Sequence, residues 1–137
     1  MKVSTFLRTY PQSYANDDSG RIIPDHLILV KITDFTNNGL NSDFLFWFQY
    51  EDEGNQSRPV ILLNPYHPMY SIIIDSRWKD IMNFFKALME IATIPSIKKM
   101  NLWEQSEYEI VLETALQYIE SMSRVRRPRV FVHFQIE

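Results

Sequence analysis

Apolar residues recur with a helical period in residues 76–92, and this segment is the centre of the predicted fold. At about 100° per residue, its apolar side chains fill roughly half of the helix circumference. These side chains are Trp78, Ile81, Met82, Phe84, Phe85, Leu88, Met89, Ile91 and Ala92. Because so broad an apolar face exceeds what one neighbour can cover, we expect it to contact both the preceding strands and a second helix.

The second helix is predicted in residues 102–123. Its apolar stripe consists of Tyr108, Val111, Leu112, Ala115, Tyr118, Ile119 and Met122. Asn101, with Glu104 three residues later, is typical of a helix start. Between the two helices, Pro95 is expected to end the first one because its nitrogen cannot donate a backbone hydrogen bond.

Strand-like patterns precede and follow the two helices. Alternating or continuously apolar runs predict strands at 26–35, 44–50, 59–63, 70–74 and 130–136, with a weaker alternation at 2–10. The pair Asn38 and Gly39 favours a turn with positive φ, which indicates an antiparallel neighbour for the strand before it. Residues 44–50 place four aromatic rings on one face, and we expect them to form a central strand.

The β-branched run at 70–74 leads directly into the first helix. Either Asp75 or Ser76 is suited to cap that helix, because each side chain can accept a hydrogen bond from an amide in the first turn. The fold class is therefore predicted as α+β, with element order β-β-β-β-α-α-β. We expect an antiparallel-dominated sheet of about five to six strands with two helices packed together on it. Residues 1–137 are expected to form a single compact domain.

The amino-acid composition excludes several classes of functional site. The chain has no cysteine, which excludes disulfides, thiolate metal sites and a cysteine nucleophile. Its three glycines lie in separate turns, so no glycine-rich phosphate-binding loop is present. No apolar run has the length of a signal-peptide core or a membrane span, and we expect a cytoplasmic protein without membrane contact or cofactor.

Histidines are candidates for a metal site or an acid–base pair. His26, His67 and His133, together with Asp25, could form a dispersed enzyme site. None of them has the short spacing that is diagnostic of a metal site. A surface or structural role is therefore the preferred interpretation, and an enzyme with a dispersed site is kept as an alternative.

A dense basic cluster follows the second helix. It consists of Arg124, Arg126, Arg127 and Arg129, whose guanidinium groups match the geometry of phosphate. Nucleic-acid or phospholigand binding through residues 124–129 is therefore one hypothesis. The same side chains would also interact favourably with the helix C-terminus, which is the structural alternative. The net charge of −3 disfavours generic binding to nucleic acid.

The second helix itself carries an acidic face. Residues 102–123 contain five glutamates and no lysine or arginine. Helical spacing gathers Glu109, Glu113 and Glu120 on the face opposite the apolar stripe. This face is either a solvated helix surface or a surface complementary to a basic protein.

The preferred functional hypothesis is a small non-enzymatic module that binds another protein. An immunity protein that neutralises a basic toxin domain is the specific form of this hypothesis. It is based on the acidic helix face and on the lack of a convincing catalytic motif in the sequence.

Overall fold

The computed structural model describes residues 2, 27–53, 56–100, 104–122 and 131–137. These residues form an α+β fold, which confirms the predicted class. The described strands are β1 (Leu27–Ile32), β2 (Phe46–Glu53), β3 (Gln56–Leu63) and β4 (Phe131–Ile136). The described helices are α2 (Tyr70–Asp75), α3 (Trp78–Ile91), α4 (Pro95–Lys98) and α5 (Gln105–Met122). The strand predicted at 2–10 lies outside the described residues except for Lys2, which forms an isolated bridge with Arg77.

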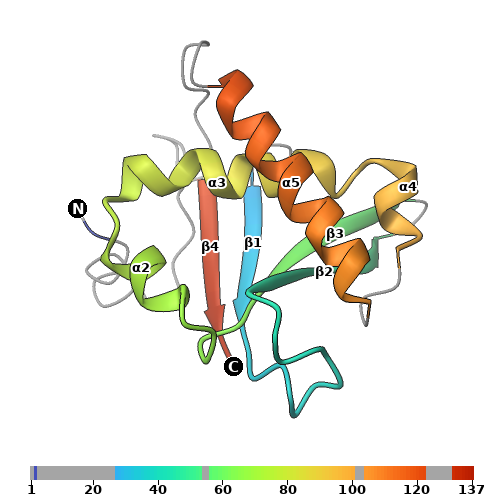
Figure 1. Cartoon of the computed structure of the whole chain (residues 1–137), viewed down its shortest axis with the longest axis horizontal. Helices are drawn as coiled ribbons and strands as arrows, with labels where there is room; N and C mark the ends of the chain where they lie inside the picture. Colours follow the sequence, from blue (N-terminus) through green and yellow to red (C-terminus); the bar gives the residue numbers. More distant parts are fainter. Residues whose placement is uncertain (1, 3–26, 54–55, 101–103, 123–130) are drawn as a thin grey trace.

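The sheet is mixed, and the prediction of an antiparallel-dominated sheet of five to six strands was wrong for the described part of the chain. Its four strands have the order β2-β3-β1-β4. Only β2 and β3 pair antiparallel, whereas β1 runs parallel to both β3 and β4. Figure 1 shows β1 and β4 side by side with their arrows in the same direction. The four-residue apolar run Val60–Leu63 in β3 is typical of a strand with a parallel neighbour and both faces covered.

The predicted central position of residues 44–50 was also wrong, because β2 lies at an edge of the described sheet. The hairpin returns the chain so that β3, and not β2, pairs with β1. The turn at Asn38 and Gly39 therefore does not join two paired strands. Gly39 nevertheless has a φ of +71°, as the sequence predicted.

The predicted strand at 70–74 is instead helix α2. Ile73 is buried, and Tyr70 and Ile74 pack against the core, whereas Ser71 and Ile72 face solvent. This inward spacing of three and four residues is helical, and an isoleucine run satisfies either period. β-propensity is weak enough for tertiary packing to override it.

Neither predicted capping residue caps α3. Its N-cap is Arg77, and no side chain provides a capping hydrogen bond. Ser76 instead ends α2, and its hydroxyl donates to the carbonyl oxygen of Ile72 at 2.7 Å. The additional short helix α2 therefore uses the residue that the sequence assigned to the start of α3.

Helices α3 and α5 contact each other, and α3 also packs on β1 and β3 (Figure 1). The ring of Phe85 packs edge-on against Phe134 of β4, with centroids 5.6 Å apart. Phe84 meets Phe46 of β2 at 6.1 Å. The broad apolar face of α3 thus has the two partners that its width predicted.

The loop between β1 and β2 is folded around Asp34. This carboxylate accepts hydrogen bonds from the backbone amide of Thr36 at 3.0 Å and from the side-chain amide of Asn37 at 3.0 Å. Asn38 donates its side-chain amide to Thr33 Oγ1 and to the carbonyl oxygen of Asp34, both at 2.8 Å. These bonds fix the loop against the end of β1.

Candidate functional site

Helix α5 presents its acidic face to solvent. The apolar stripe of Tyr108, Val111 and Ala115 is buried, as predicted. Glu109, Glu113 and Glu120 are all exposed and lie on the opposite side of the helix. The structure therefore gathers these three predicted residues on one accessible surface.

Tyr108 fixes the orientation of this face. Its ring is stacked on Phe44, with centroids 4.0 Å apart and an interplanar angle of 9°. Its hydroxyl oxygen accepts a hydrogen bond from the backbone amide of Leu45 at 3.1 Å. Because the ring is buried and its hydroxyl is hydrogen-bonded to the backbone of Leu45, α5 has little freedom to rotate about its axis.

Two exposed apolar side chains flank the acidic face, one on each side. Ile110 is 51% exposed and Leu116 is 56% exposed. With Glu109, Glu113 and Glu120 they form what we call the α5 face. The sequence contained a signal for them, because both positions fall outside the buried stripe, although their role at the surface was not predicted.

The other predicted site residues are the arginine cluster and the histidines with Asp25. Arg124, Arg126, Arg127 and Arg129 lie outside the described residues, as do Asp25 and His26. His67 lies in the turn before α2, whereas His133 is buried on β4. The described part of the chain contains no group of three or more His, Asp or Glu side chains that could hold a metal ion.

His67 is held in its neutral form by its surroundings. Its Nδ1 atom accepts a hydrogen bond from the backbone amide of Met69 at 3.1 Å, and protonation would remove this acceptor. Burial lowers the pKa of His67 below its ordinary value of 6.5, and the nearby Asp43 partly opposes this shift.

We expect His67 to titrate below pH 6.5 and Asp43→Asn to lower its pKa further. Below pH 6.5 the unfolded chain binds a proton that the folded chain resists, so this residue makes the free energy of unfolding fall as the pH drops. The measurement is an NMR titration of the imidazole resonances in both proteins. A pKa of His67 above 6.5, or one that rises in Asp43→Asn, contradicts the expectation.

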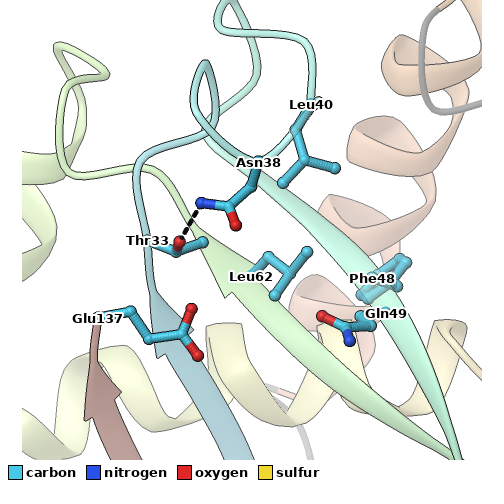
Figure 2. Close-up of a pocket in the computed structure, with 7 residues that line it drawn as sticks. All are labelled: Thr33, Asn38, Leu40, Phe48, Gln49, Leu62 and Glu137. Atoms are coloured by element: carbon cyan, nitrogen blue, oxygen red, sulfur yellow. Dashed lines mark hydrogen bonds between the residues drawn. The ribbon is translucent and has the colours of Figure 1, made fainter.

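A second surface feature is a pocket on the side of the sheet that faces away from α3 and α5. It has a volume of about 480 Å³ and is lined by Thr33, Asn38, Leu40, Phe48, Gln49, Leu62 and Glu137. Figure 2 shows Asn38, Gln49 and Glu137 around the side chain of Leu62. These residues come from the β1–β2 loop, from two strands and from the end of β4. No sequence pattern relates them.

One lysine and two glutamates lie beside this pocket. Lys31 on β1 is next to Leu62 on β3 in the parallel register. The Lys31 ammonium is 2.9 Å from a carboxylate oxygen of Glu51 and 3.9 Å from one of Glu137. Glu51 is thus the closer partner, and the three side chains together carry a formal charge of −1.

A shallower hollow lies at the end of α2, lined by Ser71, Ile72, Asp75 and Ser76. Both serine hydroxyls donate to backbone carbonyls, Ser71 to Pro68 at 3.2 Å and Ser76 to Ile72 at 2.7 Å. Neither hydroxyl is oriented by a general base as a serine nucleophile requires. The hollow therefore offers no nucleophilic site in the described residues.

In the described part of the chain, no helix combines the length and the apolar character needed to cross a membrane. Comparisons with models of protein families, with curated proteins and with solved structures found no significant match to this chain.

Proposed function

We propose that this protein is a non-catalytic binding module and that the α5 face docks a basic protein. The observation that carries the proposal is the combination of exposed Ile110 and Leu116 with three glutamates on one rigidly held helix face. Exposed apolar side chains in a contact supply affinity, and the charges between them supply orientation and association rate.

Charge defines the class of partner. The described residues 104–122 contain Glu104, Glu107, Glu109, Glu113 and Glu120 and no lysine or arginine. A surface of this kind repels acidic proteins and attracts a domain with a basic patch. A basic toxin domain that this protein neutralises, in the manner of an immunity protein, is the specific partner that we propose.

The test compares how tightly the parent protein and its charge-reversed variants bind a defined partner. The protein is co-expressed with the products of the neighbouring open reading frames, and any complex is isolated and its dissociation constant measured. Glu109→Lys combined with Glu113→Lys is expected to weaken binding by at least about 100-fold, because both attraction and orientation are reversed. Leu116→Ser, which removes an exposed side chain, is expected to weaken it by about 10-fold.

The matched control is Asp43→Lys combined with Asp75→Lys. Both aspartates are exposed and neither belongs to α5, and the two double variants change the net charge by the same amount. The control should bind as tightly as the parent protein. The proposal is wrong if no basic neighbour product forms a complex, or if both double variants weaken a complex equally.

A further inference from the structure

The pocket on the face of the sheet that is turned away from α3 and α5 has the chemistry of a cation site. We propose that it binds an alkylguanidinium or alkylammonium group, either in a small free molecule or on an arginine or lysine side chain of a peptide. The proposal is independent of docking at the α5 face, because the pocket lies on the side of the sheet turned away from α5.

The side-chain amide of Asn38 is oriented with its oxygen toward the pocket (Figure 2). Its amide nitrogen donates to Thr33 Oγ1 and to the carbonyl oxygen of Asp34, both at 2.8 Å. A carbonyl oxygen can only accept, so the nitrogen must lie on that side and the oxygen Oδ1 on the other. Figure 2 shows this oxygen directed toward the space above Leu62.

The charges at the pocket leave an excess of one negative charge. Lys31 is neutralised by Glu51 at 2.9 Å, whereas Glu137 is farther from it at 3.9 Å, with its side chain 39% exposed. The Glu137 carboxylate is therefore the net charge at the pocket, and it favours one positive charge on a ligand. An anion would meet this carboxylate and the Asn38 oxygen, and the described residues lining the pocket include no cationic side chain.

The size and lining of the pocket suit a small cation with a hydrocarbon stem. Its volume of about 480 Å³ lies in the range of small-molecule sites. Leu40 and Leu62 provide apolar surface for a hydrocarbon stem, and the exposed Gln49 provides a further hydrogen-bonding group at the rim. Because Asp34 fixes the loop that carries Asn38, the rim is formed before a ligand arrives.

The test uses n-butylguanidinium and its neutral analogue n-butylurea. Each is titrated into the isotope-labelled protein, and chemical shifts of the backbone amides are followed by NMR. We expect saturable shifts at Asn38, Gln49 and Leu62 with n-butylguanidinium, a dissociation constant on the order of 1 mM, and no saturation with n-butylurea. Equal binding of the two compounds, or shifts confined to α5, would overturn the proposal.

Substitutions at the rim give effects of opposite sign. Glu137→Gln is expected to weaken n-butylguanidinium binding about fivefold, and Gln49→Glu to strengthen it by a similar factor. Gln49→Lys should abolish binding, because it adds a positive charge at the rim. These positions are exposed, so the variants are expected to fold. Unchanged affinity in all three variants contradicts the proposal.

Glu113→Gln is the control that separates the cation site from the α5 face. It removes a carboxylate from α5 and should leave n-butylguanidinium binding unchanged, so the two proposals can fail separately.

The source of the cation is tested with peptides. A capped tripeptide with a central arginine is compared with its citrulline counterpart. Binding of the arginine peptide alone identifies a peptide side chain as a possible source of the cation, whereas binding of n-butylguanidinium without the peptide identifies a free molecule.

Discussion

Replacement of Asn64 by alanine is expected to lower the free energy of unfolding by about 2–3 kcal/mol, because it removes all three hydrogen bonds of one buried side chain at once. Asn64 is only 2% exposed. Its amide nitrogen donates to the carbonyl oxygens of Ser42 and Phe44, both at 3.0 Å, and its Oδ1 atom accepts from the backbone amide of Tyr66 at 3.0 Å. One side chain therefore joins the loop before β2 to the turn after β3.

The substitution Asn64→Asp tests the direction of these bonds. It replaces a donor with a carboxylate that faces two carbonyl oxygens, and at pH 7 it should destabilise the fold more than Asn64→Ala does. The excess should shrink on acidification, because a protonated carboxyl group can donate one hydrogen bond again. Urea denaturation at several pH values measures both effects.

Asn37→Ala is the matched control for Asn64. Asn37 lies in the loop between β1 and β2 that Asn64 also contacts, is exposed, and its side-chain amide bonds to Asp34 at 3.0 Å. Its loss should cost no more than about 0.5 kcal/mol. If Asn64→Ala is as mild as Asn37→Ala, the three hydrogen bonds of the Asn64 side chain do not hold the loop as the structure indicates.

Replacement of Tyr108 by alanine is the second large effect, with an expected loss of about 3–5 kcal/mol. The ring is 5% exposed and lies 4.0 Å from Phe44 and 5.3 Å from Phe46 between centroids. Its removal leaves a cavity where α5 meets the start of β2, and it also leaves the amide of Leu45 without the acceptor at 3.1 Å.

Tyr108→Phe separates the two contributions. It keeps the stacked ring and removes the hydroxyl, so the expected loss is about 1 kcal/mol. Tyr66→Ala is the control, since Tyr66 is 76% exposed and its truncation should change stability by less than about 0.5 kcal/mol. A Tyr108→Phe variant as unstable as Tyr108→Ala would mean that the hydroxyl, and not the ring, holds α5.

Tyr108 also supports the α5 face that we propose as the partner-binding surface. Tyr108→Ala should weaken partner binding through disorder of α5, whereas Leu116→Ser should weaken it without a change in stability. Comparison of unfolding and binding for the same variants therefore separates support of the surface from contact with the partner. Burial raises the pKa of the Tyr108 hydroxyl above 10, so this group stays neutral in all these measurements.

The predicted and observed elements agree where a single local period was present. The predicted segments 76–92 and 102–123 carry apolar stripes with helical spacing, and they contain helices α3 (Trp78–Ile91) and α5 (Gln105–Met122). The run at 70–74 failed because Ile72, Ile73 and Ile74 fit a strand and a helix equally well. Packing of Ile73 into the core, with Ile72 outside, selected the helix.

The acidic residues of α5 could be predicted because a helix fixes the angle between positions four residues apart. Glu109 and Glu113 must share a face once α5 forms. The pocket could not be predicted in this way. Asn38, Gln49 and Glu137 are far apart in sequence and meet only through the pairing of β2 with β3 and of β1 with β3 and β4.

The sequence by itself determined the α+β class, the two amphipathic helices, the hydrophobic strand segments and the acidic face of α5, because each depends on the period of neighbouring residues. Only the tertiary structure decided the parallel pairing of β1, the helical state of 70–74 and the position of the pocket. These features depend on contacts between distant segments, and the free energy of such contacts is not encoded in any local pattern.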